Sequence, residues 1–432
     1  MNLPEGLDSS HDKLVSLALG KITGGTSSPV KVTPEKLFGR HCAVLGSTGG
    51  GKSWTVAKII EECAKFKGAK IIIIDATGEF RSLDESYTRH YHLNTPVLKN
   101  PNSIEIAIPP TDFVESDFMA MFNPAGRVQG PKLREAMKSL RLANLAPDLF
   151  PSGIVEKIQN SKENYRKAMN RGRNSSLVDN PSQEFDVSKL VKQLVQECCW
   201  DEGDRWGKAS PDLGYCSSLF TRIQSVIYSS SLRSVFNNAS LEKFGSILED
   251  FLRSSDNVLR ICLSDVRYEF NAREILANVI GRRLLESARF ENFRHQPILA
   301  VLDEAHNFLG RKIGEDEEFA RLDAFELIAK EGRKYGLHIC LATQRPRDIT
   351  EGVLSQMGTL LVHRLTNDND RQVVERACGE IDRSAASFLP NLKQGELALV
   401  GVDFPIPMTI QVQPPASPPM SDSPDFQDLW TR

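Results

Sequence analysis

Short apolar runs alternate along the chain with segments of helical spacing, and this pattern predicts a parallel α/β sheet. HCAVLG at 41–46 precedes a glycine cluster, and SWTVAKIIEECAKF at 53–66 then places apolar residues at the spacing of an amphipathic helix. KIIIID at 70–75 is a second apolar run, so strand, loop, helix and strand follow one another as in a βαβ unit. Runs of the same kind recur at 258–264, 298–304, 338–343 and 359–363. We therefore expect five or six buried parallel strands.

The segments between these runs suggest how the chain is organised. Helical patterns such as PKLREAMKSLRLANL, VSKLVKQLVQECCW and SLEKFGSILEDFLR interrupt the strand series, and GELALVGVDFPIPMTIQV alternates like a β-hairpin near the end. The Pro/Ser-rich sequence after the hairpin has the composition of an unstructured tail. The expected parts are a short strand segment at 1–40, an α/β core at 41–110 and 256–412, a helical insertion at 111–255 and a disordered tail at 413–432.

Charge adds one question to this picture. The chain has 53 basic and 56 acidic side chains, for a formal net charge of −3, which weighs against nucleic acid as a partner. Locally, however, residues 127–173 hold eleven Lys/Arg and four Asp/Glu. This basic stretch is either a DNA contact or a solvated helical face on the outside of the protein.

Cysteine usage and hydropathy indicate the compartment. The chain has eight cysteines, mostly within apolar stretches and without a CxxC pair, which favours a reducing, cytoplasmic setting. No apolar run approaches the roughly 18 residues that a membrane span needs. We therefore expect a cytoplasmic protein without a membrane partner.

The glycine cluster is a candidate phosphate site. GSTGGGKS at 46–53 satisfies G-x-x-x-x-G-K-[ST] between a strand and a helix, the context that this motif requires. Glycines let successive backbone N–H groups turn toward phosphate oxygens, and the helix N-terminus adds a positive dipole. Lys52 would reach the β- and γ-phosphates of ATP, and Ser53 or Thr48 would offer a hydroxyl to Mg²⁺, with Ser53 the preferred ligand. The nucleotide-binding candidates are Gly46, Thr48, Gly49, Gly50, Gly51, Lys52, Ser53 and Thr55.

Polar residues at the ends of other strands complete such a site. ILAVLDEAH at 298–306 ends in two carboxylates, of which Asp303 would hold Mg²⁺ and Glu304 would polarise the attacking water. Gln344 follows the next strand and could contact the γ-phosphate or this water. Asp75 and Glu79 could orient the water or Lys52, although carboxylates at a strand end are often structural.

Two arginines are candidates for neutralising charge that develops during phosphoryl transfer. Arg333 lies in EGRKYG, after the helix that follows the acidic strand, and Arg364 lies in HRLTN, after a later strand. An arginine with this role acts within its own subunit or across an interface. The alternative is that both only pair with surface acids or cap a helix.

Taken together, RHCAVLGSTGGGKS, IIIIDATGEF, ILAVLDEAHNFL, KEGRKYG, ATQRP and HRLTN resemble the HerA branch of the HerA/FtsK family of ring-forming ATPases, over roughly residues 36–412. The resemblance implies a RecA-like P-loop NTPase core, ATP and Mg²⁺ at subunit boundaries, a homohexameric ring, translocation on double-stranded DNA and a partner nuclease. It also implies that Arg333 is the finger that acts across the boundary.

The segment ahead of the phosphate loop departs from the family pattern. Typical members carry a small β-barrel there, and only about forty residues precede the loop in this chain. We interpret GKITGGTSSPVKV as the last strands of such a barrel. Bacterial relatives of this type also occur beside sirtuin-like, NAD-consuming or nuclease effectors in antiphage systems, so the resemblance implies such a partner.

Three functions are compatible with these features. The first is an ATP-driven translocase of double-stranded DNA. The second is a ring that assembles and regulates an effector with little translocation. The third, a conjugation motor on the membrane, shares the core motifs but has no spanning helix to support it.

Overall fold

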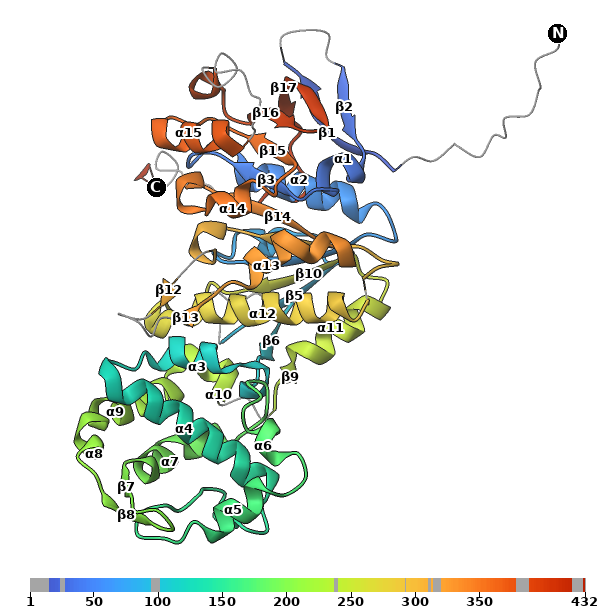
Figure 1. Ribbon diagram of the computed structural model, residues 1–432. Coiled ribbons are helices and arrows are strands. Elements are labelled where there is room, and N and C mark those ends of the chain that lie inside the picture. Colours follow the sequence, from blue (N-terminus) through green and yellow to red (C-terminus); the bar gives the residue numbers. More distant parts are fainter. Residues whose placement is uncertain are drawn as a thin grey trace, which may run out of the picture.

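One large sheet organises the chain (Figure 1). The computed structural model describes residues 15–23, 28–94, 102–236, 240–291, 293–309, 312–313, 320–377, 388–421 and 430–431. Within these residues the sheet has 13 strands in the order β2-β1-β17-β16-β15-β3-β14-β11-β4-β10-β5-β6-β9. This mostly parallel sheet, flanked by helices, confirms the predicted α/β class.

From β15 to β9 in this order, neighbouring strands run parallel. Each predicted apolar run forms one of these strands, because β-branched and other apolar residues fill a sheet that is covered on both faces. The strands β5, β6 and β9 come in addition to the expected ones. The bounds are β15 (Thr359–Val362), β3 (Cys42–Leu45), β14 (Leu337–Thr343), β11 (Ile298–Leu302), β4 (Lys70–Asp75), β10 (Val258–Cys262), β5 (Thr88–His92), β6 (Ser103–Ala107) and β9 (Glu242–Lys243).

Antiparallel strands extend the sheet beyond β15. The alternating sequence predicted the hairpin of β16 (Glu396–Gly401) and β17 (Phe404–Val412), and in the structure β16 also pairs with β15. β1 (Leu17–Ile22) then pairs with β17, and β2 (Pro29–Val32) pairs with β1. The two strands of the 1–40 segment therefore form the outer edge of the main sheet, while 1–14 and 24–27 lie outside the described residues. Its origin in a β-barrel stays a prediction.

Helices cover the two faces of the sheet. Ile71 and Ile73 of β4 pack into one apolar cluster with the buried residues of α1 (Pro34–Phe38) and α2 (Lys52–Ala64). Ile72 and Ile74 face the opposite cluster, which includes residues of α12, α13 and α14. This alternation follows from the two-residue period of a strand. The bounds of these helices are α12 (Ala272–Arg289), α13 (Ala324–Glu331) and α14 (Glu351–Leu354), and α15 (Asp368–Ala377) follows β15.

The predicted insertion is mainly helical, and most of it lies beyond β6 and β9, at the lower end of Figure 1. Its last part differs from the expected boundary, because β9 pairs with β6 in the main sheet and α11 packs into the main apolar core. Its outer part has a small apolar core of its own around Leu142, Phe150 and Trp206. One expected helix, 187–200, ends early because its last residues enter a short antiparallel pair, β7 and β8. The elements are α3 (Glu115–Phe122), α4 (Gly126–Leu145), α5 (Glu163–Met169), α6 (Asn174–Leu177), α7 (Leu190–Glu197), β7 (Cys199–Asp201), β8 (Trp206–Ala209), α8 (Asp212–Tyr215), α9 (Ser217–Ile227), α10 (Arg233–Phe236) and α11 (Phe244–Arg253).

The tail differs in part from the expected disorder. Residues 413–421 form no helix or strand, but they contact the turn η1 (Glu79–Ser82). The Met420 N–H donates to the Glu79 carbonyl at 2.8 Å, and the Ser82 hydroxyl donates to the Pro418 carbonyl at 2.5 Å. Proline and serine thus exclude regular structure here without excluding packing. Residues 422–429 and 432 lie outside the described part of the chain.

The cysteines in the described residues are free thiols, and Cys378 lies outside that part. Across the same residues, no helix combines the length and apolar character that crossing a bilayer requires.

Candidate nucleotide-binding site

The predicted phosphate loop lies between β3 and α2, as the motif requires. Gly49 and Gly51 have φ values of 73° and 106°, a left-handed conformation that residues with a Cβ rarely adopt. Gly51 is the N-cap of α2, and its carbonyl accepts the Thr55 N–H at 3.0 Å. Lys52 and Ser53 then open the helix. The loop therefore places Lys52, Ser53 and the helix N-terminus at the carboxyl edge of the sheet.

A buried histidine supports this loop from behind. His363, directly after β15, is fully buried, and its Nδ1–H donates to the Glu396 carbonyl at 2.9 Å. Since a carbonyl only accepts, Nε2 is unprotonated and accepts from the Thr55 hydroxyl at 2.8 Å. Burial lowers the pKa of His363 to about 4, which keeps the ring neutral. A Cβ on Gly46 would lie 2.5 Å from the Cβ of His363, so this close approach requires glycine.

Lys52 meets a group of carboxylates. Its side chain is 7% exposed. Burial lowers the pKa of Lys52, while the nearby Glu304, Asp303 and Glu79 act in the opposite direction. The two predicted carboxylates after β11 and Glu79 after β4 thus gather around the lysine of the phosphate loop. These carboxylates follow strands that are not adjacent to β3. They still meet Lys52, because the carboxyl ends of all these parallel strands share one edge of the sheet.

The predicted base and sensor contact each other directly. Gln344 Nε2 donates to Glu304 Oε1 at 2.5 Å, and the Thr48 hydroxyl donates to Gln344 Oε1 at 2.5 Å. Glu304 has a φ of 48°, a strained conformation for a residue other than glycine, which clusters at functional sites. The other carboxylate oxygen lies 3.2 Å from His306 Nδ1. The amide of Gln344 therefore links the phosphate loop to Glu304.

The surroundings of Glu304 keep its side chain ionised, as a general base requires. Burial raises its pKa, but the contacts with His306, Lys52 and Gln344 outweigh this effect, so the pKa lies below its usual range. The carboxylate form is the one that accepts a proton from water.

Two predicted contacts differ from expectation. The Asp75 carboxylate is fully buried and contacts Arg260, the Gly78 N–H and the Phe80 N–H, which favours the structural role that carboxylates at a strand end often have. Similarly, the Thr55 hydroxyl binds His363 behind the loop. Both residues support the site through other groups, which sequence spacing does not reveal.

Glu79, in contrast, reaches the start of α2. Burial raises the pKa of Glu79, and a hydrogen bond with the Ser53 hydroxyl opposes this rise. Thr77, in the same turn, donates its hydroxyl to Asp303 Oδ2 at 3.2 Å. The turn after β4 therefore meets both residues that were predicted to bind Mg²⁺.

The donor set fits Mg²⁺. Burial raises the pKa of Asp303 well above its usual range, and Asp75, Glu304 and Glu79 raise it further, so a cation would stabilise its charged form. Among the described residues no cluster of three or more His, Cys, Asp or Glu side chains could hold a metal alone. Mg²⁺ in nucleotide sites binds one or two protein ligands together with phosphates, and Asp303 and Ser53 are oxygen ligands of this kind.

The two candidate arginines lie at opposite edges of the sheet. Arg364 follows β15 at the nucleotide edge, where its carbonyl accepts the Ser47 N–H at 3.0 Å. Arg333 lies in η8 (Gly332–Tyr335), which precedes β14, whereas Gln344 follows β14. The seven residues of β14 span about 23 Å. Arg333 therefore does not reach the phosphate site of its own chain.

The basic stretch 127–173 is largely paired. Within the described residues, nine of its eleven Lys/Arg side chains form ion pairs with carboxylates. Arg171 contacts both carboxylate oxygens of Asp148, at 2.7 and 2.9 Å, and Arg141 is fully buried near Glu115. The local excess of positive charge in the sequence is thus compensated in space, often by acids from later in the chain.

Comparison with known proteins shows the relationships of the chain. The family described as "Helicase HerA, central domain" matches residues 17–194. The DNA double-strand break repair helicase HerA of Pyrococcus furiosus is 32% identical over 389 residues, which cover 89% of this chain and 67% of that protein. The chain belongs to the HerA family. The probable DNA double-strand break repair helicase HerA of Methanocaldococcus jannaschii is 25% identical over 405 residues, covering 92% and 76% of the two chains.

Solved structures share the fold of this HerA family member. VirB4 of Thermoanaerobacter pseudethanolicus superposes with a TM-score of 0.55 at 14% identity and covers 95% of this chain and 98% of its own. The bacterial conjugative coupling protein TrwB has a TM-score of 0.52 at 14% identity, with 93% and 91% covered. The P-loop NTPase fold is therefore confirmed, and the HerA relationship together with the site makes the chain a P-loop ATPase.

Proposed function

We propose that the chain is one subunit of an ATP-hydrolysing ring, a homohexamer, that binds and translocates double-stranded DNA. The HerA family relationship supports this function, and so do the names of its relatives, which are DNA double-strand break repair helicases. The gathering of Lys52, Glu304 and Gln344 at one sheet edge supports the hydrolytic step.

The position of Arg333 supports the ring most directly. It is exposed at the amino edge of the sheet, on the side away from the phosphate loop of its own chain. A finger arginine at this edge serves the nucleotide of a neighbouring copy. An assembly in which the amino edge of one subunit faces the carboxyl edge of the next is head-to-tail, the kind of interface that forms a ring when its rotation closes.

In the proposed mechanism, Lys52 and the loop amides bind the β- and γ-phosphates, and Ser53 and Asp303 would hold Mg²⁺. The metal supplies charge neutralisation when it is bound. Glu304 accepts a proton from the attacking water, and Gln344 orients that water or reports the γ-phosphate. Arg333 of the neighbouring copy neutralises charge on the transferring group, and Arg364 is the candidate for the same role within the chain.

The ring acts in the cytoplasm with an effector protein, a nuclease or a sirtuin-like NAD-consuming enzyme, in antiphage defence or DNA processing. The resemblance to bacterial HerA-type ATPases carries this part of the proposal.

The paired basic stretch favours a second candidate. If 127–173 holds little uncompensated charge, the ring has fewer evident contacts for DNA phosphates. The alternative is an ATP-dependent scaffold that assembles and controls the effector with little translocation.

Measuring ATP hydrolysis with and without duplex DNA tests the proposal. We expect duplex DNA to stimulate hydrolysis and Lys52→Ala to abolish it. Glu304→Gln should still bind ATP, because its shape and the contact with Gln344 persist, while kcat falls by about 10²- to 10⁴-fold with the loss of the base. An unchanged kcat for Glu304→Gln would contradict the assigned base.

The same assay separates the two candidate functions. A rate that responds to duplex DNA supports the motor. A rate that ignores DNA but responds to a co-purified effector supports the scaffold. Native mass measurement of the complex gives the number of subunits, and a monomer at every protein concentration would contradict the ring.

A further inference from the structure

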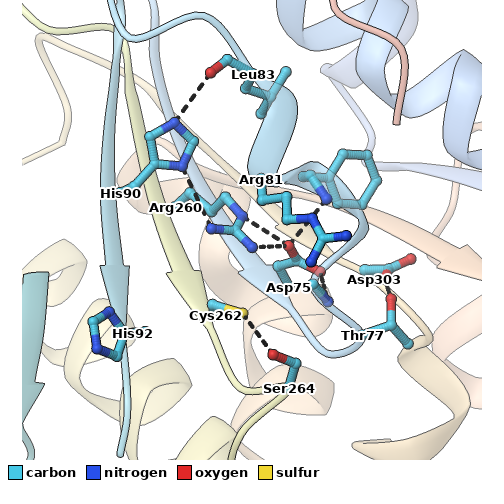
Figure 2. Close-up of polar contacts among 12 residues, drawn as sticks. Asp75, Thr77, Arg81, Leu83, His90, His92, Arg260, Cys262, Ser264 and Asp303 are labelled. Atoms are coloured by element: carbon cyan, nitrogen blue, oxygen red, sulfur yellow. Dashed lines mark hydrogen bonds and ion pairs between the residues drawn. The ribbon is translucent and has the colours of Figure 1, made fainter. Parts of the chain in front are cut away.

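A buried arginine lies next to the nucleotide site without touching it. Arg260 is on β10, adjacent to β4, and is 2% exposed. Its Nε and Nη2 each lie 2.7 Å from Oδ2 of Asp75 (Figure 2). Arginine is rarely buried unless paired, and replacing a buried ion pair by apolar side chains is often neutral for stability. A buried pair beside the nucleotide site is therefore a candidate for a role besides packing.

The Asp75 carboxylate that contacts Arg260 also binds the backbone of the turn after β4. Its Oδ1 accepts the Gly78 N–H at 2.8 Å, and its Oδ2 accepts the Phe80 N–H at 3.1 Å. Gly78 has a φ of 84°, so the turn follows one tight path. The carboxylate, fixed by Arg260, thus determines where the backbone of residues 78–80 lies.

His90 connects Arg260 to the end of the same turn. Its Nε2–H donates to the Leu83 carbonyl at 3.1 Å, at the end of the same turn. The other nitrogen, Nδ1, is therefore unprotonated and faces Arg260 Nη1 at 3.4 Å. Burial, and then the charge of Arg260, lower the pKa of His90, which agrees with a neutral ring. Figure 2 shows these side chains reaching from β4, β5 and β10 toward the turn. We call Asp75, Arg260 and His90 the turn clamp.

The clamped turn carries two residues of the site. Thr77 donates to Asp303 at 3.2 Å. Burial raises the pKa of Glu79, and the nearby Ser53 hydroxyl acts to lower it. We propose that Arg260 and His90 are positioning residues for ATP hydrolysis, which hold the turn so that Thr77 and Glu79 set the geometry of Asp303 and Ser53. The proposal rests on the ATPase activity within the proposed function.

Charge balance gives the clamp a second effect. Asp75, Glu79, Asp303 and Glu304 lie close enough to influence one another, and Lys52 is the cation that faces the nucleotide. Arg260 supplies the positive charge that balances the fully buried Asp75 from within the sheet.

Steady-state kinetics of the whole chain tests the clamp. In Arg260→Met we expect kcat for ATP to fall by about 10- to 100-fold, since small misplacements of catalytic groups have effects of this size. The Kd of a fluorescent ATP analogue should change less than about threefold, because the phosphate loop is intact. Arg260→Lys should recover part of kcat, since an ammonium contacts Asp75 but cannot also reach His90.

The chain offers a matched control in Arg141. This arginine is also fully buried beside a carboxylate, but it lies in the insertion, so Arg141→Met tests for a general loss of stability. His90→Gln is the second clamp variant. It keeps the Arg260–Asp75 pair and a donor for Leu83, and kcat should fall less than in Arg260→Met. It keeps the test decisive if Arg260→Met does not fold.

The outcomes are distinguishable. A folded Arg260→Met whose kcat stays within about twofold of wild type overturns the clamp, and so does a loss of kcat equal to that in Arg141→Met. If Arg260→Met fails to fold, an unchanged kcat in His90→Gln overturns it. A wild-type chain without ATPase activity would contradict the proposed function itself.

Discussion

At the residue scale, His363 explains why the phosphate loop needs its first glycine. The loop passes so close to the Cβ of His363 that a Cβ on Gly46 would lie 2.5 Å away. The imidazole cannot retreat, because both of its nitrogens are engaged, with Glu396 and with Thr55. Loop position and histidine position are therefore coupled.

We expect Gly46→Ala to lower the free energy of unfolding by about 1–3 kcal/mol, as overpacking of a rigid site does, and to weaken ATP binding. Urea denaturation and the Kd of an ATP analogue measure the two effects. Gly352→Ala is the control, because a Cβ there meets no atom within 4 Å. Equal stability of the two variants would show that the loop can shift away from His363.

Some site residues could be predicted because local sequence places them. Lys52 and Ser53 follow from the glycine pattern, and Asp303, Glu304 and Gln344 follow from the rule that parallel strands end at one edge. Arg260 and His363 could not be predicted in this way. They are single polar residues in or next to apolar strands, and their partners lie more than thirty residues away.

At the element scale, the sequence pattern identified the apolar strands but missed β5. TRHYH contains two histidines and an arginine, a composition that does not indicate a buried strand. His90 and His92 are nevertheless 3% and 6% exposed. His90 bonds Leu83, and His92 Nδ1 bonds the Ser103 hydroxyl at 2.8 Å. Tertiary partners thus bury polar residues that propensity would leave outside.

The junction of α3 and α12 rests on one buried carboxylate. Asp117 is fully buried, and its Oδ2 accepts from the Val114 N–H at 2.9 Å and from Arg282 Nη2 at 2.5 Å. Asp117→Ala should lower the free energy of unfolding by about 3–5 kcal/mol, because it leaves Arg282 without its counter-charge. Urea denaturation measures the change. The control Asp148→Ala removes an exposed partner of Arg171 and should have little effect.

At the scale of the whole molecule, the positive charge of the basic stretch 127–173 is balanced by acids from elsewhere in the chain. The basic stretch visible in the sequence is matched in space by acids such as Asp179, Asp201 and Glu197. Sequence could not predict this, since those acids lie outside the stretch. If the ring translocates DNA, contacts to phosphate lie mainly on other surfaces, and Arg171→Ala should leave the salt dependence of DNA binding unchanged.

Stability should fall as the pH falls below about 6.5. Burial lowers the pKa of His41 and of His363 to about 4 from 6.5. Between pH 6.5 and pH 4, the two histidines therefore bind protons in the unfolded chain but stay neutral in the folded chain. The stability these neutral rings contribute is complete above pH 6.5 and is lost progressively toward pH 4. At pH 5 each histidine should account for a loss of about 2 kcal/mol.

His41→Asn isolates one of these contributions. His41 has a φ of 63°, and asparagine tolerates this conformation. Between pH 7 and pH 5, wild type should lose about 2 kcal/mol more of its unfolding free energy than the variant does, because all other titrating groups cancel in the comparison. Parallel pH profiles would show that His41 does not titrate as described.

The sheet order also constrains how the protein is made. The strand that leads into the phosphate loop, β3, pairs with β14 and β15, and Leu337 follows Leu45 by 292 positions. At about 5–20 residues per second, a ribosome needs roughly 15–60 s to supply the first of these neighbours. Until then β3 has two open edges, which are sites for aggregation. If translation stops before β15, β3 lacks one of its two neighbouring strands. A shortened product would therefore depend on chaperones and would not serve as a smaller ATPase.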